Sequence, residues 1–117
     1  MISSLNSSIS ALNALGQKMA VHSNNVANVN TDEFKKSRAL LKEGVANDVQ
    51  VEISKVDTPG PTYIETEGDQ MTERELSNVD IAEEIPQTML TQRYFQANLK
   101  IFNVIDEMLG SVIDIIK

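Results

Sequence analysis

The sequence predicts a mainly α-helical protein with a small β element. Long N- and C-terminal helices are expected to pack as an elongated, coiled-coil-like pair around a short β-hairpin insert. Apolar residues recur every three or four positions near both ends of the chain, which indicates amphipathic helices. Between these ends the period changes to two, which is typical of strands. A Pro-Gly-Pro segment, residues 59–61, fits neither a helix nor a central strand.

The chain has 117 residues, which fits one ordinary domain, and the change of period divides it into three parts. Residues 1–44 contain the N-terminal helix and a signature segment that follows it. Residues 45–76 form the short β-rich insert. Residues 77–117 form a C-terminal helix that is expected to pair with the N-terminal one.

The N-terminal amphipathic segment covers residues 3–29. Its apolar seam steps by three and four over more than three heptads, as in helices that pack against another helix. The seam consists of Leu5, Ser8, Leu12, Leu15, Met19, His22, Val26 and Val29. We expect His22, the only histidine, to be a packed polar residue, because no second His or Cys exists to complete a zinc site.

The insert shows the pattern of short strands. Val49, Val51 and Ile53 alternate with polar residues, and the segment TYIET follows after DTPGP. This pattern predicts a β-hairpin, or a pair of short strands, around the Pro-Gly turn. A lone hairpin of this size is only marginally stable in water.

The C-terminal helix, residues 80–116, is the longest and most apolar segment. Asp80 is a candidate N-cap, and Glu83 would complete a capping box. Pro86 is expected to kink the helix or delay its regular start, because it removes the hydrogen bond to Ala82. The first of two apolar seams consists of Ile85, Thr88, Gln92, Phe95, Leu99, Phe102, Asp106, Leu109, Ile113 and Ile116. The second consists of Tyr94, Asn98, Ile101, Ile105, Met108, Val112 and Ile115.

Two apolar seams require two partners, and the chain offers one other long helix. The uncovered seam would leave on the order of 10 kcal/mol of burial unrealised, at about 1.5–3 kcal/mol for each large side chain. Soluble monomers rarely expose such a stripe. The sequence therefore predicts self-association or a partner helix. The alternative is that the insert folds back and covers the second seam.

No pattern indicates catalysis or metal binding. The chain has no cysteine, which excludes disulfides, thiolate metal sites and a cysteine nucleophile. It also has no glycine-rich phosphate loop and no spacing that suggests a Ser/His/Asp set. The carboxylates of residues 65–84 lack the spacing of a calcium loop and are interpreted as a solvated acidic surface. We therefore expect no enzyme activity, no cofactor and no metal.

The net charge of −7 is concentrated in the middle of the chain. Residues 45–86 carry two basic and eleven acidic groups, a net charge of −9, against +2 for residues 1–44. An acidic middle argues against nucleic acid and against an anionic membrane surface as partners. No apolar run reaches the roughly 18 residues of a membrane span, so no membrane insertion is expected. The start MISSLNSSISAL lacks the basic region of a secretory signal, so export would leave the chain uncleaved.

Four asparagines occur in the segment SNNVANVNTDEFKKS, residues 23–37. Helix termination explains Asn28 and Asn30, with Thr31 capping the following turn. Asn24 and Asn28 are i, i+4 neighbours on one helix face. A carboxamide both donates and accepts hydrogen bonds. Such a row suits a polar contact that fixes the register of packed helices, as one buried asparagine does in coiled coils.

The same segment resembles the N-terminal signature of the bacterial flagellar axial proteins, the rod and hook family. The matched positions are Asn24, Asn25, Ala27, Asn28, Asn30, Thr31, Phe34 and Lys35. The preceding SLNSSISALNALGQKMAVHS is similar to the first helix of that family. The closing segment from ELSNVD onward is similar to the family's C-terminal segment. Its matched positions are Ser77, Asn78, Val79, Asp80, Gln92, Arg93, Phe95, Gln96, Ala97, Asn98 and residues 106–109.

The chain departs from the family pattern at a few positions. Glu33 stands where the family usually has glycine, which argues against a left-handed turn there. Pro86 interrupts a region that is usually plain helix, and Tyr94 replaces a common small residue. The short middle resembles the short proximal-rod members, whereas ELSNVD is more similar to the longer members.

The resemblance implies a short rod-like member: a structural subunit of the basal-body rod that is exported unfolded by the flagellar type III apparatus. It implies that the paired terminal helices polymerise into an inner tube, with the middle facing outward, in the periplasm-spanning rod. The implied partners are further copies of the chain, other rod and hook proteins, and the export apparatus. Isolated chains could also swap helices.

Most of the matched positions are also the residues expected to set assembly and register: Asn24, Asn25, Asn28, Asn30, Thr31, Phe34, Lys35, Ser77, Asn78, Val79, Asp80, Gln92, Arg93, Gln96, Ala97 and Asn98. The residues expected to pack the helices are Leu5, Leu12, Leu15, Met19, Val26, Phe95, Leu99, Phe102, Leu109 and Ile113. The alternative function is a soluble coiled-coil adaptor or export chaperone that uses rod-like helices to bind axial proteins.

Overall fold

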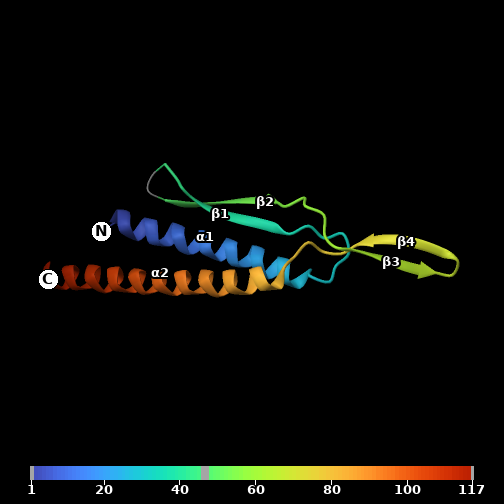
Figure 1. Cartoon of the computed structure of the whole chain (residues 1–117). Helices are drawn as coiled ribbons and strands as arrows, with labels where there is room; N and C mark the ends of the chain where they lie inside the picture. The colour runs from blue at the N-terminus through green and yellow to red at the C-terminus, as the bar shows by residue number, and fades with distance from the viewer. Residues whose placement is uncertain (1, 46–47, 117) are drawn as a thin grey trace.

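The computed structural model describes residues 2–45 and 48–116 of the chain. Its elements are α1 (Ile2–Ala27), β1 (Ser37–Glu43), β2 (Val49–Lys55), β3 (Thr62–Glu67), β4 (Gln70–Glu75) and α2 (Ile81–Ile116). The two helices lie side by side and antiparallel, so α1 begins at the end of the molecule where α2 ends (Figure 1). The β1–β2 hairpin lies along α1, and the β3–β4 hairpin projects beyond the other end of the helix pair.

The molecule is elongated, as the helix pair predicts. It measures 84 × 25 × 17 Å, and its radius of gyration is 21.0 Å. A globular domain of this length has a radius of gyration of about 13 Å. The predicted fold class is therefore confirmed, with two hairpins between the helices. No helix in the described part of the chain is long and apolar enough to cross a membrane.

The end of α1 agrees with the interpretation of the asparagines as helix-terminating residues. The helix ends at Ala27. The Asn24 carbonyl accepts two hydrogen bonds from Asn28, one from its backbone amide at 3.2 Å and one from its side-chain Nδ2 at 2.9 Å. Thr31 Oγ1 donates to Asn28 Oδ1 at 3.2 Å and closes the following turn.

The turn after α1 contains one left-handed residue. Glu33 has a φ of 60°, a region that costs an L-residue about 1–2 kcal/mol. Its amide donates to the carbonyl of Glu75 at 2.9 Å, which anchors the turn to the end of β4. The expectation that glutamate excludes a left-handed turn here was wrong, because this hydrogen bond and the surrounding turn hold the strained conformation.

The strand pairing differs from the prediction. β2 pairs antiparallel with β1, and Ala39 lies opposite Ile53 in their register. β3 pairs antiparallel with β4, with Ile64 opposite Glu73. The predicted hairpin between residues 49–55 and TYIET was therefore wrong, and the insert contains two separate two-stranded sheets.

The prolines explain why the sheets are separate. Pro59 and Pro61 have no backbone N–H and cannot donate hydrogen bonds to a strand ladder. The segment that contains them therefore connects the two hairpins and does not act as a hairpin turn. The β3–β4 turn forms at Gly68 instead, where a φ of 65° suits a residue without a Cβ. The first hairpin closes through a hydrogen bond of 2.8 Å from the Gly44 amide to the Asp48 carbonyl.

The start of α2 confirms the predicted N-cap. Asp80 Oδ1 accepts a hydrogen bond from the Ala82 amide at 2.8 Å. The predicted capping box does not form, because the Glu83 carboxylate binds Lys36 Nζ at 2.6 Å instead. α2 is continuous over 36 residues and includes Pro86, so the proline does not delay the start of the helix.

The core of the chain is small and lies around α1. The buried apolar side chains among the described residues are Ala14, Leu15, Val21 and Ala39. Their polar counterparts are Ser8, His22, Asn25, Ser77, Glu84 and Thr91. The other predicted seam residues of α1, namely Leu5, Leu12, Met19 and Val26, are half-buried.

α2 contacts α1 along a single mixed seam. Its least exposed positions step by three and four and are Glu84, Thr88, Thr91, Phe95, Asn98, Phe102, Ile105 and Leu109. This line takes members from both predicted seams, because one antiparallel partner packs on the line between two adjacent stripes. Two residues predicted to pack, Leu99 and Ile113, are consequently 42% and 59% exposed.

Candidate functional site

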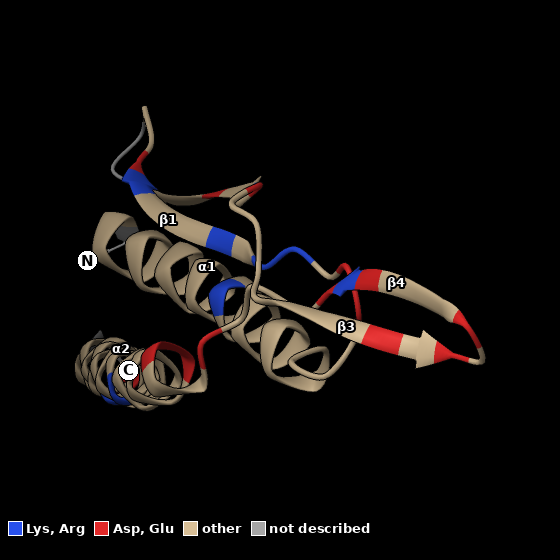
Figure 2. Cartoon of the chain, turned by 45° about the vertical axis from the view of Figure 1, so that its right-hand side comes forward, with Lys and Arg blue, Asp and Glu red and all other residues tan. Residues whose placement is uncertain are grey.

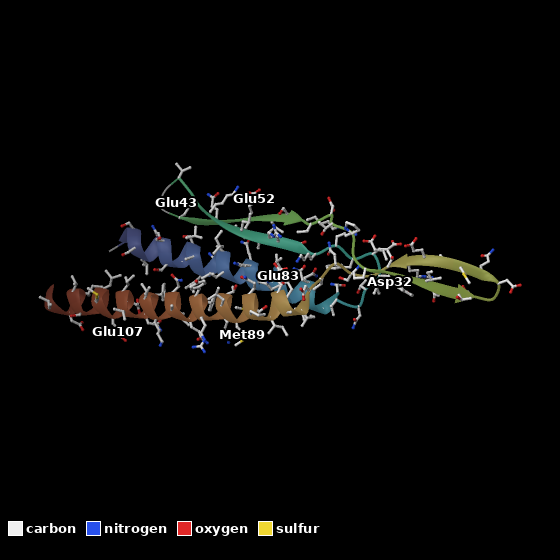
Figure 3. The ribbon with its side chains drawn as sticks, viewed as in Figure 1. Asp32, Glu43, Glu52, Glu83, Met89 and Glu107 are labelled. Carbon is white, nitrogen blue, oxygen red and sulfur yellow. The ribbon has the colours of Figure 1, made fainter. Side chains whose placement is uncertain are left out.

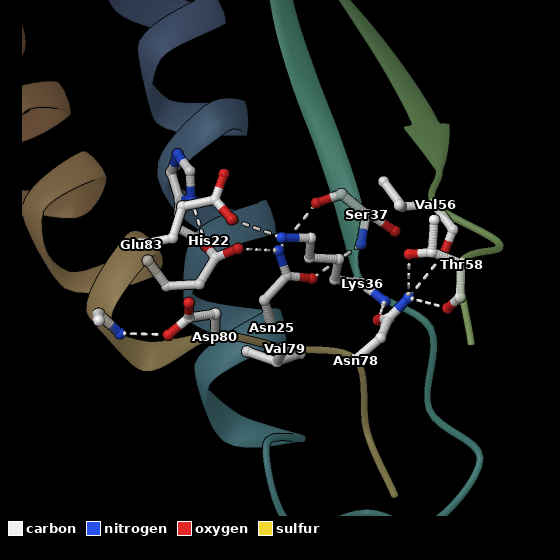
Figure 4. A network of polar contacts seen from close by, with 12 residues as sticks. His22, Asn25, Lys36, Ser37, Val56, Thr58, Asn78, Val79, Asp80 and Glu83 are labelled. Atoms are coloured by element: carbon white, nitrogen blue, oxygen red, sulfur yellow. Dashed lines mark hydrogen bonds and ion pairs between the residues drawn. The ribbon is translucent and has the colours of Figure 1, made fainter. Parts of the chain in front are cut away.

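Four residues join both helices to the first hairpin, and we call them the polar junction: His22, Asn25, Ser37 and Glu84. Figure 4 labels the first three. His22 Nδ1 lies 2.6 Å from Glu84 Oε2, and Asn25 Nδ2 donates to Glu84 Oε1 at 3.0 Å. Asn25 also pairs with the Ser37 backbone in both directions, donating to its carbonyl at 2.8 Å and accepting from its amide at 2.9 Å. The junction therefore connects α1 to α2 and to the start of β1.

The junction is buried and its central amide is saturated. Asn25 is 0% exposed, and Glu84 is 4% exposed. Both donors of the Asn25 carboxamide are used, and its oxygen accepts one hydrogen bond. Because each of these partners would be costly to leave unpaired in a buried position, the contact specifies one alignment of α1, α2 and β1.

The asparagine contact between the two helices comes from Asn25 and not from Asn24 or Asn28. Asn24 is exposed, and the Asn28 amide binds the backbone of its own helix. Within the described residues, no hydrogen bond joins either side chain to α2. The partner residue Glu84 was missed, since a helical carboxylate is usually exposed. Glu84 belongs to neither predicted seam, so the sequence pattern gave no signal for it.

His22 is a packed seam residue, as predicted. It is 8% exposed, and its Nε2 is buried without a hydrogen-bond partner among the described residues. While Glu84 is ionised it can only accept, so the His22 proton in this contact lies on Nδ1. No group of three or more His, Cys, Asp or Glu side chains in the described ranges could hold a metal ion.

Asn78 ties together three connecting segments at the base of the hairpins. Its Oδ1 accepts from the Lys36 amide at 2.6 Å, and its Nδ2 donates to the carbonyls of Val56 and Thr58, both at 2.8 Å. The backbone amide of Asn78 donates to the Phe34 carbonyl at 3.2 Å. The two sequence segments that resemble the rod family therefore meet here, and the contact of Lys36 with Asn78 joins positions 42 residues apart in the chain.

Glu75 closes the same region from β4. Its carboxylate accepts hydrogen bonds from Lys35 Nζ and from the Gly60 amide, the latter at 2.5 Å. The hydrogen bond from Lys35, followed by that from Gly60, holds the pKa of the Glu75 carboxyl below its ordinary value. A Cβ on Gly60 would lie 2.2 Å from the Leu76 carbonyl oxygen, so this close approach requires glycine.

The remaining predicted site residues are dispersed. Ser77 is buried, and its Oγ accepts from the amide of half-buried Val79 at 3.2 Å. Asn98 lies on the helix seam and donates to the Tyr94 carbonyl at 2.9 Å. The exposed positions far from the junction are Asn30, Thr31, Gln92, Arg93, Gln96 and Ala97. The structure therefore brings Asn25, Asn78 and Ser77 into internal contacts and leaves the exposed positions on the surface.

The second feature of the site is an uncovered face of α2. We call it the apolar stripe and define it as Leu90, Tyr94, Ile101, Met108, Val112 and Ile115. These side chains are between 41% and 80% exposed. Five of them belong to the predicted second seam, whose exposure is thereby confirmed for those members. The β1–β2 hairpin lies on α1, so the alternative in which the insert covers this stripe was wrong (Figures 1 and 3).

Charged side chains are unevenly distributed over the molecule. Acidic side chains gather on the β3–β4 hairpin (Figure 2). There Arg74 pairs with Glu65 at 2.5 Å and lies 3.9 Å from Asp32. These groups are exposed, in agreement with the interpretation of this part of residues 65–84 as a solvated acidic surface. For Glu84 that interpretation was wrong, because its carboxylate is buried in the polar junction.

An extended helix pair with a small core and an uncovered apolar helix face defines a class of elongated structural proteins. Two family models match the ends of this chain. Residues 5–35 match the family described as flagella basal body rod protein, and residues 74–115 match flagellar basal body rod FlgEFG protein C-terminal. Together the two segments cover more than half of the chain. The chain therefore belongs to the flagellar rod and hook family.

No curated protein matches the chain. The two matched families confirm the resemblance of both sequence segments and give the chain a structural role in the flagellar basal body. They are structural and not enzymatic families, and they associate this chain with other rod and basal-body proteins.

Proposed function

We propose that the chain is a rod subunit that is exported unfolded by the flagellar type III apparatus and polymerises through its terminal helices. The observation that carries this proposal is the apolar stripe of α2, which no element of the described chain covers. About half of each stripe side chain is still exposed. At about 1.5–3 kcal/mol for complete burial, a neighbour that covers the six side chains would gain on the order of 5–9 kcal/mol.

The small core supports export in an unfolded state. Four buried apolar side chains, two of them alanines, stabilise the described part of the chain weakly. A chain with little stability of its own unfolds readily for passage through a narrow channel. It then gains order when neighbours cover its apolar surface.

The three parts of the chain have different tasks in this proposal. Residues 1–44 and 77–117 supply the assembling helices, and residues 45–76 face outward. The family positions divide in the same way. Asn25 and Asn78 fix the fold of the subunit, whereas half-buried Asn28 and the exposed positions contact neighbouring subunits; the exposed ones are Asn24, Asn30, Thr31, Gln92, Arg93, Gln96 and Ala97.

Deletion of the gene, followed by electron microscopy of isolated basal bodies, tests the proposal. We expect truncated rods without hooks, and the point at which assembly stops gives the level of the subunit. Complete, rotating flagella in the deletion strain would contradict the proposal and favour a soluble adaptor or export chaperone.

A complementation series tests the role of the stripe. The double variant Ile101→Ser/Met108→Ser is expected to be exported but not incorporated into rods. A matched variant of the exposed β2 surface, Glu52→Ser, is expected to restore complete rods. Asn24→Leu/Asn28→Leu tests the asparagines at the end of α1 in the same strain. Normal incorporation of that variant would show that Asn24 and Asn28 do not contribute to the assembly contacts.

A further inference from the structure

α2 extends beyond α1 at the end where α1 begins. α1 has 26 residues and α2 has 36, and the contact of His22 with Glu84 aligns their other ends. The extra ten residues correspond to about 15 Å of helix. We call residues 106–115 the overhang, and Figure 1 shows it as the red end of α2. Its apolar side chains include Val112, Ile113 and Ile115, which are 41%, 59% and 80% exposed.

The opposite end of the helix pair carries an open apolar groove. It has a volume of about 380 Å³ and lies between the last turns of α1 and the first turns of α2. The residues that line it are Ser23, Val26, Ala27, Ile85, Thr88 and Met89. Ile85 and Met89 are 49% and 57% exposed, and no charged side chain lines the groove. The groove continues the α1–α2 seam, so a third helix placed there would extend an existing helix contact.

The charges of α2 differ between its two ends. Arg93 and Lys100 lie on the exposed surface beyond the groove, and Asp106, Glu107 and Asp114 lie on the overhang. Within the described residues, none of these five groups takes part in an ion pair. Of the two carboxylates that precede Ile85 in the sequence, Glu83 pairs with Lys36 and Glu84 is held in the polar junction.

We propose that the overhang of one copy packs into the groove of the next copy. Apolar side chains at the end of α2 would fill an apolar groove, and the acidic groups of the overhang would approach Arg93 and Lys100. The occupant is a second copy of this chain, because its overhang carries both the apolar side chains that match the groove and the carboxylates that match Arg93 and Lys100. This inference rests on the proposed function, since it specifies which surfaces of the terminal helices meet.

The contact is open and directional. The overhang and the groove lie at opposite ends of one straight helix pair, so a chain cannot fill its own groove. Each copy therefore offers one groove and one overhang, and repetition of this heterologous contact produces a chain of subunits that does not close into a dimer. An isologous contact between two apolar stripes would instead stop at two copies.

Disulfide cross-linking tests the contact, because the chain has no cysteine of its own. Met89→Cys marks the groove and Ile113→Cys marks the overhang; both positions are exposed, so both variants should fold. When the two purified variants are mixed at high concentration and oxidised, we expect the mixed dimer to be the main product by mass spectrometry. A chain that carries both substitutions should form a ladder of products. Mixing Ser54→Cys, on the exposed surface of β2, with Ile113→Cys provides the matched control.

The outcomes separate this inference from the proposed function. Mixed dimers no more abundant than in the control, or homodimers alone, would overturn the contact. The same test in basal bodies isolated from a strain that carries the double variant gives a second measurement. Normal rods that contain no cross-linked ladder would contradict the proposed contact between overhang and groove, but not the proposed rod function. Failure of the rod function itself appears separately, as complete flagella in the deletion strain.

Charge reversal tests the ionic part of the contact with the same cross-linking measurement. Arg93→Glu/Lys100→Glu on the Met89→Cys chain should lower the yield of mixed dimer by about tenfold at low salt. Asp106→Lys/Glu107→Lys/Asp114→Lys on the Ile113→Cys chain should restore most of that yield. If the reversed overhang fails to restore the yield, the assignment of the overhang as the partner of this surface is wrong.

Discussion

α1 and α2 are both long amphipathic helices, but the fold uses them differently. α1 lies between the β1–β2 hairpin and α2 and carries three of the four buried apolar side chains of the described chain (Figure 1). α2 packs against α1 alone among these elements and buries only Glu84 and Thr91. The difference teaches that α1 holds the isolated subunit together. Most of the apolar surface of α2 remains available for contacts outside the chain.

The largest expected effect comes from the matched pair Leu15→Ala and Leu90→Ala. Leu15 on α1 is 3% exposed, so its truncation should lower the free energy of unfolding by about 2–5 kcal/mol. Leu90 on α2 is 45% exposed, and its truncation should cost less than about 1 kcal/mol. Urea unfolding of dilute protein followed by circular dichroism measures both. Equal losses would show that α2 contributes to the core as much as α1 does.

Asn25→Ala is expected to have the next largest effect. It leaves the Ser37 amide, the Ser37 carbonyl and a buried oxygen of Glu84 without a partner, which should cost about 1–3 kcal/mol. Asn24→Ala, one position away and exposed, is the control and should change stability by less than about 0.5 kcal/mol. Amide hydrogen exchange at Ser37 reports the loss locally. Unchanged protection of that amide would show that the polar junction does not hold β1.

A smaller effect on stability, with a larger effect on association, is expected for Ile101→Ser. Ile101 is 51% exposed on the apolar stripe, so the dilute chain should lose less than about 0.5 kcal/mol. Sedimentation over a range of concentrations should show weaker association than in the unmodified chain, because apolar contact area is lost. A well-folded unmodified chain that stays monomeric at high concentration would contradict the role assigned to α2.

The smallest effect lies outside both helices and provides a baseline for the comparison. Lys35 lowers the pKa of the Glu75 carboxyl from its ordinary value of 4.5. This group therefore adds stability above pH 4.5, and the contribution is lost as the pH falls through the lower folded-state pKa. Glu75→Gln should flatten a small part of the stability profile below pH 5, as measured by urea unfolding at several pH values. An unchanged profile would show that solvent screening removes the contribution.

Local sequence patterns predicted the parts of the fold that depend on a few neighbouring residues. The asparagine segment ends α1, and Asp80 begins α2, because each acts on backbone groups within four positions. Strand pairing was not predictable in this way, since alternation does not identify the partner of a strand. The adjacent Leu40 and Leu41 also obscure the period of β1.

The sequence predicted the kind of site but not all of the residues that form it. The heptad pattern placed His22 on a seam, and the apolar character of α2 predicted an uncovered stripe. Two choices needed the packed structure: which asparagine turns inward, and which line along α2 faces α1. Asn24 and Asn25 have the same side chain. Only their positions around the helix decide which one is buried and which one is exposed. Glu84 has a partner because antiparallel packing places it beside His22.

The β3–β4 hairpin determines where the protein can be labelled. In the described structure, no heavy atom beyond its chain neighbours lies within 4 Å of the position that a Cβ on Gly68 would take. The hairpin tip lies at one end of an 84 Å molecule, whereas α1 begins and α2 ends at the other (Figure 1). A reporter peptide fused to either helix end would lie beside the packing surfaces. The same peptide inserted between Gly68 and Asp69 would make the subunit visible in a living cell while leaving both helices unobstructed.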